Sequence, residues 1–140
     1  MKTAVRYYTK SGNTQKLADA IAEIAGVAAQ TVDVPFEEEV DVLFLGSSVY
    51  GFGVDEQISN FIGNLDSGRV KTVVNFSTAA LVPSTYSQVY KLLAAKNIPL
   101  DRREFHCRGK YKFMHKDSPN EADLNAVKRF ADEIIRGISA

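Results

Sequence analysis

Apolar and polar positions along the chain follow two spacings, one of about two residues and one of between three and four. Five short runs are continuously apolar or alternate apolar with polar side chains, which is typical of β-strands. Longer segments with the helical spacing lie between and after these runs. The predicted strands are residues 4–9, 30–34, 41–47, 72–77 and 103–107.

Four segments repeat apolar residues on one face of a helix. The first is followed by Gly26, a typical helix stop, and the third begins near Ser84. The last has Asn120 as a cap and Asp123 in its first turn. The predicted apolar faces are Leu17, Ala18, Ile21, Ala22 and Ala25; Ile58, Phe61, Ile62 and Leu65; Tyr86, Val89, Tyr90 and Leu93; and Leu124, Val127, Phe130, Ala131, Ile134, Ile135 and Ile138.

Strands that alternate with helices predict an α/β domain, with a parallel sheet and helices on both of its faces. Residues 42–45 are continuously apolar, as in a strand buried on both faces, whereas the second and fifth strands alternate, as edge strands do. These patterns predict a doubly wound five-stranded sheet of order 2-1-3-4-5. The second and third strands are too close in sequence for a full crossover helix, so a loop or a short helical turn is expected over residues 35–40.

Length and composition predict one domain, residues 1–140, with 45% hydrophobic and 24% charged residues. No apolar run approaches the ~20 residues of a membrane span. The N-terminus shows no secretion signal and Cys107 is the single cysteine, so we expect a cytoplasmic protein. The formal net charge is zero, which gives no general reason to expect nucleic-acid or membrane binding.

The segment Thr9-Lys10-Ser11-Gly12-Asn13-Thr14 lies where the first strand is expected to become a helix. The first turn of a helix has unpaired N–H groups and a partial positive charge, so it attracts anions. Gly12 lets a ligand approach the backbone, and the three hydroxyl residues can each donate a hydrogen bond. The segment predicts a phosphate site, with the Lys10 side chain expected to point to solvent.

Two further polar segments follow the other central strands, at residues 47–53 and 77–80. Ligands of doubly wound sheets bind outside the carboxyl ends of the strands, where the strand order reverses. Small and hydroxyl residues in all three segments therefore predict one crevice for a ligand that carries a phosphate.

These residues resemble the flavodoxin family over essentially the whole chain. The family's phosphate loop reads Thr/Ser-x-Thr/Ser-Gly-x-Thr, and residues 9–14 match every fixed position. Its second loop resembles Ser47-Ser48-Val49-Tyr50-Gly51, and short flavodoxin-like proteins resemble this chain at Cys107-Arg108-Gly109 and Pro119-Asn120-Glu121. The chain departs from many flavodoxins in lacking Trp, in having no aromatic residue in its third loop, and in being neutral rather than acidic.

The resemblance implies a flavodoxin-like fold with FMN as cofactor. It implies that residues 9–14 hold the phosphate, that Tyr50 or Phe52 stacks on the flavin ring, and that backbone groups of residues 77–79 pair with its pyrimidine end. Gly51 provides a peptide that can rotate beside the ring. The expected cofactor-binding residues are Thr9, Lys10, Ser11, Gly12, Asn13, Thr14, Ser48, Val49, Tyr50, Gly51, Phe52, Ser77, Thr78 and Ala79.

Two functions follow from this resemblance. The first is an electron carrier that serves redox partner proteins, a reductase and an acceptor. The second is a small FMN-dependent oxidoreductase that acts on NAD(P)H, a quinone or protoporphyrinogen, with the later half of the basic stretch from Arg102 to Lys116 expected at the ligand rim. A receiver domain is disfavoured, because Thr9, Ser47 and Ser77 stand where it needs carboxylates.

Simpler interpretations remain open for several segments. Residues 9–14 are also compatible with a plain strand-to-helix turn capped by Asn13 or Thr14. Tyr50 is compatible with a surface aromatic, residues 77–78 with an ordinary strand end, and the basic residues with solvated surface. His106 is expected at the surface and Cys107 half-buried, and no spacing of His, Cys or Asp suggests a metal site.

Overall fold

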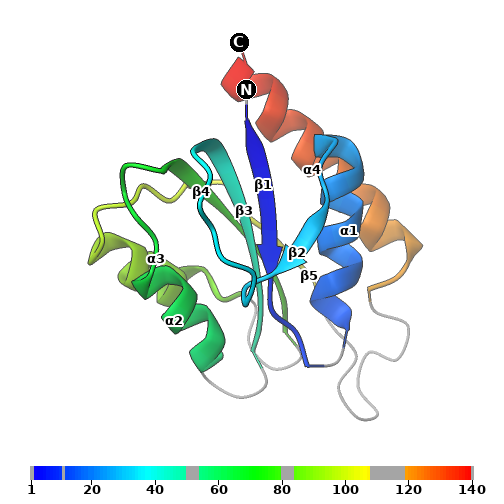
Figure 1. The fold of residues 1–140 in the computed structure, drawn as a ribbon. Coiled ribbons are helices and arrows are strands. Elements are labelled where there is room, and N and C mark those ends of the chain that lie inside the picture. Colours follow the sequence, from blue (N-terminus) through cyan, green and yellow to red (C-terminus); the bar gives the residue numbers. More distant parts are fainter. Residues whose placement is uncertain (1, 11, 50–53, 80–83, 108–118, 140) are drawn as a thin grey trace.

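The computed structural model describes residues 2–10, 12–49, 54–79, 84–107 and 119–139; of residues 49, 79, 138 and 139 only the backbone is described. Strands and helices alternate as the sequence predicts (Figure 1). The elements are β1 (Thr3–Tyr7), α1 (Asn13–Ala25), β2 (Ala29–Thr31), β3 (Val40–Val49), α2 (Glu56–Gly63), β4 (Val70–Ala79), α3 (Tyr86–Ala94), β5 (Phe105–Cys107) and α4 (Glu121–Ser139).

The five strands form one parallel sheet in the order β2-β1-β3-β4-β5, which confirms the predicted topology. β3 and β4 are longer than predicted. Their pairing begins at Val40 opposite Val70 and continues to Val49 opposite Ala79. The predicted strand at 103–107 is shortened to Phe105–Cys107, and the one at 30–34 is shifted to Ala29–Thr31. The two central strands thus extend through the polar residues expected to form loops.

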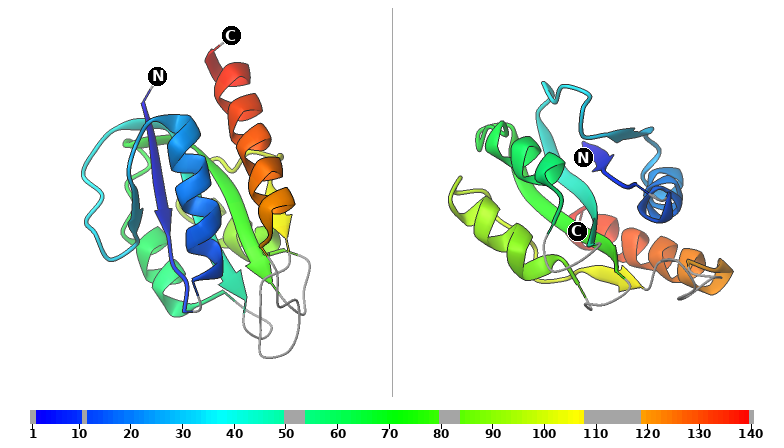
Figure 2. Two further views of the ribbon diagram at one scale, coloured as in Figure 1. Left: turned by 90° about the vertical axis from the view of Figure 1, so that its right-hand side faces the viewer. Right: turned by 90° about the horizontal axis from the view of Figure 1, so that it is seen from below.

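The helices lie in two layers (Figure 2). α1 and α4 cover one face of the sheet, and α2 and α3 cover the other. Each face has its own apolar core, because successive side chains of a strand point to opposite sides. Val42 and Phe44 of β3 pack toward α1, whereas Leu43 and Leu45 pack toward α2. The central strands are therefore buried on both faces, as their continuous apolar run predicts.

The connection from β2 to β3, residues 32–39, contains no helix. This confirms that the connection is too short to contain a full crossover helix. Val32 N–H donates to Tyr7 O at 3.0 Å, and the ring of Phe36 lies 5.3 Å from the guanidinium carbon of Arg6. Phe36 also meets Phe61 of α2 edge-on, with ring centroids 6.4 Å apart. One aromatic side chain thus covers sheet surface that a helix covers elsewhere.

Helix ends follow the predicted signals. Gly26 ends α1 in the left-handed conformation, with φ of 73°, and its N–H donates to Ala22 O at 2.9 Å. At the start of α4, Asp123 N–H donates to Asn120 Oδ1 and Asn120 N–H donates to Asp123 Oδ2, both at 2.9 Å. α2 ends at Gly63, so Leu65 lies after the helix and not in it, but it remains buried.

Among the described residues, none of the helices has both the length and the apolar character needed to cross a membrane.

We expect Asn120→Ala to lower the free energy of unfolding by about 1 kcal/mol, because it removes the reciprocal cap of α4. The measurement is chemical denaturation of the two proteins. Asn125→Ala is the matched control, since Asn125 is exposed within the same helix and alanine is the better helix former there. Equal stability of Asn120→Ala and the unchanged protein would contradict a structural role for the cap.

Candidate functional site

The carboxyl ends of β1, β3 and β4 lie at one edge of the sheet, the lower edge in Figure 1, and α1 begins there. The strand order reverses at this edge, because β1 leads to β2 on one side and β3 continues to β4 on the other. The three segments predicted to surround a ligand therefore leave the sheet side by side.

The turn from β1 into α1 is built around Gly12. Its φ of 89° is left-handed, its N–H donates to Thr9 Oγ1 at 3.1 Å, and a Cβ at this position would meet nothing within 4 Å. Among the described residues no side chain caps α1, and its first turn contains no acidic residue. Within the described residues, the first turn of this helix thus has partial positive charge without a carboxylate of its own.

Lys10 lies at the same edge, with its side chain 61% exposed, as the sequence predicts. Its Nζ lies 3.5 Å from Asp55 Oδ2. Asp55 also caps α2, by accepting a hydrogen bond from Gln57 N–H at 2.9 Å. The lysine therefore offsets a carboxylate near the candidate site.

Three buried hydroxyls, of Thr14, Ser48 and Thr78, contact one another; we call them the hydroxyl cluster. Thr14 Oγ1 bonds to Ser48 Oγ and lies 3.0 Å from Thr78 Oγ1, and the Ser48 and Thr78 hydroxyls lie 3.2 Å apart. Each hydroxyl has one donor and two acceptor positions, so the three can satisfy one another. The cluster joins α1, β3 and β4 where the predicted ligand segments begin.

Gly46 permits this close approach. A Cβ at Gly46 would overlap the ring of Phe76 and come within 2.9 Å of Thr14 Cγ2. Tyr8 N–H donates to Gly46 O at 3.1 Å, which ties the end of β1 to β3. The missing side chain therefore lets α1 lie against the sheet at the height of the hydroxyl cluster.

On the other face of β3 and β4, the residues next to the hydroxyl cluster contact the start of α3. Ser47 Oγ donates to Thr85 Oγ1 at 2.9 Å, and Asn75 Nδ2 lies 3.2 Å from the same oxygen. Ser77 is also fully buried, but its hydroxyl has no hydrogen-bond partner among the described residues. A buried polar atom without a partner costs about 1–3 kcal/mol, which makes Ser77 a feature that needs an explanation.

A carboxylate extends this polar network to the edge of the sheet. Glu104 Oε2 accepts hydrogen bonds from Ser84 Oγ at 2.6 Å and from Asn75 Nδ2 at 3.2 Å. Its other oxygen lies 3.1 Å from His106 Nδ1. Asn75, Thr85 and Glu104 were not predicted as site residues. For Asn75 the signal is its amide inside the otherwise apolar run of residues 73–76.

The predicted cofactor residues divide into three groups. The structure brings Thr9, Lys10, Gly12, Asn13, Thr14, Ser48 and Thr78 to one edge. Ser77 lies on the opposite face of β4, and the side chains of Val49 and Ala79 are not described, although both end paired strands. Ser11, Tyr50, Gly51 and Phe52 lie outside the described residues, so their predicted contacts stay predictions.

The basic stretch begins far from this edge. Arg103 donates to Asp101 Oδ2 at 2.9 Å, and a Cβ on Gly137, near the end of α4, would lie 3.3 Å from Arg103 Nη1. That end of α4 lies at the opposite edge of the sheet (Figure 1). The later basic residues, for which the rim contact is predicted, lie outside the described part of the chain, so that contact stays a prediction.

The two reactive side chains of β5 are placed as predicted. His106 is exposed and paired with Glu104. Cys107 is half-buried, and burial raises the pKa of its thiol to about 12. The thiol therefore stays protonated near neutral pH, which supports a packing role over a nucleophilic one.

Solved structures with the same architecture identify the fold. An archaeal flavodoxin superposes with a TM-score of 0.80 over 100% of both chains, at 17% identity. Oxidised Flavodoxin 2 from Bacillus cereus has a TM-score of 0.73 at 18% identity and covers 98% of this chain and 99% of its own. The chain has the flavodoxin-like fold.

The flavodoxin-like fold also occurs within a larger neighbour. The rubredoxin oxygen:oxidoreductase of Desulfovibrio gigas has a TM-score of 0.78 at 14% identity, covering 99% of this chain but 36% of that one. An uncharacterized protein of Methanocaldococcus jannaschii is 25% identical over 138 residues, 89% of this chain and 91% of that protein. No protein-family model matches the sequence.

We expect Gly46→Ala to lower the free energy of unfolding by about 1–3 kcal/mol, because the new methyl group overlaps the buried ring of Phe76 and presses on Thr14. Gly63→Ala is the matched control: a Cβ there meets nothing within 4 Å. The control is expected to be neutral or slightly stabilising, since alanine favours the helix. Chemical denaturation compares the stabilities of Gly46→Ala and Gly63→Ala. Similar stability of both variants would contradict the close approach at Gly46.

Proposed function

We propose that the protein binds FMN at the carboxyl edge of the sheet and carries electrons between redox partner proteins. The observation that carries this proposal is the start of α1, where left-handed Gly12 faces open space and no described side chain caps the helix. An uncapped helix start without acidic residues suits a phosphate dianion. The likeness to flavodoxins supports FMN as the molecule that brings this phosphate.

The hydroxyl cluster gives this site a fixed shape. Because Thr14, Ser48 and Thr78 are buried and bonded to one another, they hold α1 and the ends of β3 and β4 at a set separation. We assign them the role of positioning the ligand segments, with the phosphate bound by backbone N–H groups of the turn. A site held in this way loses little conformational entropy when the ligand binds.

The ends of β3 and β4 also suit the ring of a flavin, because the backbone of residues 77–79 reaches the carboxyl edge, where it is expected to meet the pyrimidine end. The buried Ser77 side chain faces α3 and is assigned no contact with the ring. When bound, FMN supplies the redox chemistry, and the chain supplies binding, orientation and exclusion of water. Tyr50 and Phe52 remain the proposed ring contacts.

The test of the phosphate site is a titration with FMN and with riboflavin, which lacks the phosphate. We expect FMN to bind at least about 30-fold tighter, since charge-assisted hydrogen bonds contribute about 1.5–3 kcal/mol each. Gln15→Glu adds a carboxylate to the first turn of α1, so it is expected to weaken FMN binding about tenfold or more and to leave riboflavin binding unchanged.

Gln30→Glu is the matched control, because Gln30 is exposed on β2 and away from the start of α1. It adds the same charge and is expected to change neither affinity. Equal binding of FMN and riboflavin, or equal FMN binding by both variants, would exclude a phosphate site at this helix.

A second measurement separates a carrier from an oxidoreductase. We expect the FMN-loaded protein to oxidise NADH and NADPH slowly with a quinone acceptor, and to be reduced rapidly only through a reductase. The likeness to free-standing flavodoxins over the whole chain favours this outcome. Rapid multiple turnover of NAD(P)H by the protein alone would show that it is an oxidoreductase.

A further inference from the structure

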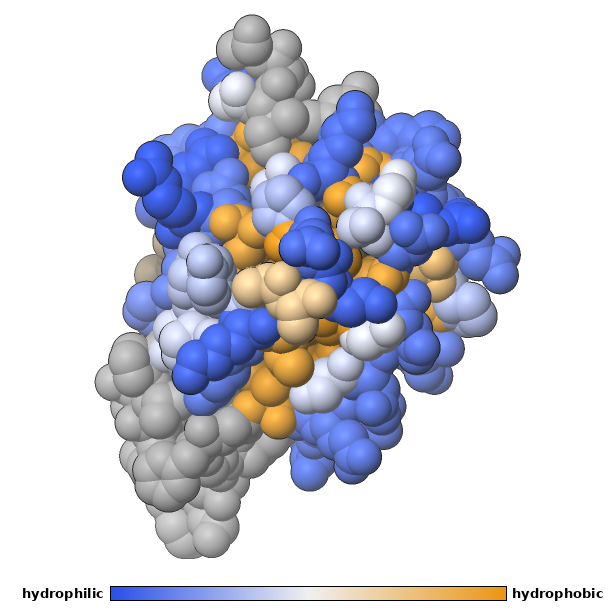
Figure 3. Space-filling model, turned by 90° about the vertical axis from the view of Figure 1, so that its left-hand side faces the viewer, coloured by the Kyte–Doolittle hydropathy of each residue, from blue (hydrophilic) through white to orange (hydrophobic). Residues whose placement is uncertain are grey.

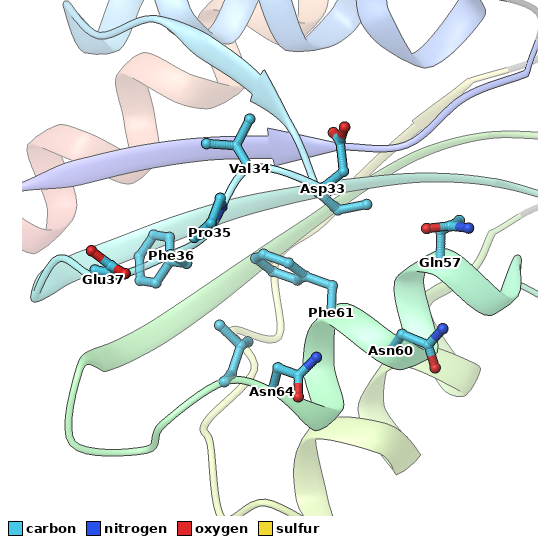
Figure 4. A pocket seen from close by; sticks show the side chains of 11 residues that line it. Asp33, Val34, Pro35, Phe36, Glu37, Gln57, Asn60, Phe61 and Asn64 are labelled. Carbon is cyan, nitrogen blue, oxygen red and sulfur yellow. The ribbon is translucent and has the colours of Figure 1, made fainter.

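A groove lies between the β2–β3 loop and α2, on the face of the sheet away from α1 (Figure 4). Its volume is about 500 Å³. It exists because the crossover from β2 to β3 is a loop, which covers less of the sheet than a helix would. We call it the α2 groove; its lining residues are Val32, Asp33, Val34, Pro35, Phe36, Glu37, Gln57, Asn60, Phe61, Asn64 and Leu65.

The base of the α2 groove is apolar and firmly held. Phe61 points from α2 toward the loop, where it meets Phe36 edge-on. Beneath Phe36 lies Arg6, which is 6% exposed and whose Nε has no hydrogen-bond partner among the described residues. The view from the side of α2 and α3 shows hydrophobic side chains exposed in a band between hydrophilic ones (Figure 3). An apolar partner surface can therefore be buried here without displacing the core.

The polar side chains that line the α2 groove are amides and carboxylates. Gln57, Asn60 and Asn64 form a row along α2, at the i, i+3 and i+7 positions of one helical face. Asp33 and Glu37 stand on the loop side (Figure 4). No lysine or arginine is among the lining residues that the structure describes.

Further charge on the loop has the same sign. Glu37, Glu38 and Glu39 are exposed, and in the described part of the chain none of them forms an ion pair. Arg69 donates to Glu37 O, which is a backbone carbonyl, so the carboxylate of Glu37 is not neutralised by that bond. The apolar groove is thus bordered by a negative edge that attracts cationic partners.

We propose that the α2 groove docks an amphipathic helix of a partner protein, whose apolar stripe is flanked by lysine or arginine. α2 has eight residues and is therefore about 12 Å long, which matches two turns of a docked helix. Apolar side chains at i, i+3 or i+4 and i+7 would pack on the Phe36–Phe61 pair, and the flanking cations would meet Asp33 and Glu37.

A helix fits this place better than an extended strand. The groove lies over the face of the sheet, whereas the backbone groups that the edge strand β2 leaves unpaired lie along the side of the sheet. A strand docked there would leave its own N–H and C=O groups without partners, whereas a helix satisfies them internally. The amide row of α2 can still bond to polar side chains of the docked helix.

The test is selection from a displayed library of random helical peptides, with the purified protein as bait. We expect enriched peptides to carry the apolar stripe and two or more flanking cations. Their affinity should fall at least about tenfold when Asn60→Arg places a large cation on the rim, and about fivefold with Asp33→Asn/Glu37→Gln. Raising the salt concentration should also weaken binding.

Matched controls are Asn125→Arg, and Asp19→Asn/Glu133→Gln, which make the same charge changes at exposed positions of α1 and α4. They are expected to leave affinity unchanged, and melting temperatures confirm that every variant folds. Failure to enrich any peptide, or enriched peptides that bind Asn60→Arg as tightly, would overturn the proposal. So would self-association of the protein that Asn60→Arg abolishes, because a second copy would then fill the groove.

This proposal is independent of the cofactor. None of the predicted FMN residues lines the α2 groove. Selection with and without added FMN therefore separates the two ideas: flavin titration tests the edge of the sheet, and peptide binding tests the face.

Discussion

The structure depends on the pairing of β3 and β4 beyond their apolar segments. The two strands stay paired in register over residues 47–49 of β3 and residues 77–79 of β4. Since side chains alternate, this extension sends Ser48 and Thr78 toward α1, and Ser47 and Ser77 toward α3. The same few residues thereby connect both helical layers to the sheet. They also fix where the three segments that are predicted to hold a ligand leave the sheet.

The sequence predicted strand order better than strand length. Order follows from which runs are apolar throughout and which alternate, and that pattern depends on burial over whole strands. The ends of β3 and β4 were missed because serine and threonine are typical of turns. Here their hydroxyls are buried and bond to one another across the sheet. Local pattern does not reveal a partner 30 residues away.

The local backbone geometry of the candidate site could be predicted from the sequence, whereas the contacts between distant side chains could not. Gly12 and the start of α1 follow from the local pattern of residues 9–14. The bonds from Asn75 to Thr85 and Glu104 join three elements, and no local spacing encodes them. The short crossover after β2 was evident from the sequence, but its consequence, a groove beside α2, depends on how Phe36 and Phe61 meet.

The net charge of the sequence likewise does not reveal where charges gather in the fold. A formal net charge of zero gave no reason to expect a charged partner. In the fold, the start of α1 presents partial positive charge at the edge of the sheet, with no acidic residue in its first turn, whereas Glu37 and its neighbours present negative charge beside the α2 groove. Opposite charges at separate places attract different partners, because screening confines each field to about 10 Å. A neutral chain can therefore bind an anionic cofactor at one place and a cationic helix at another.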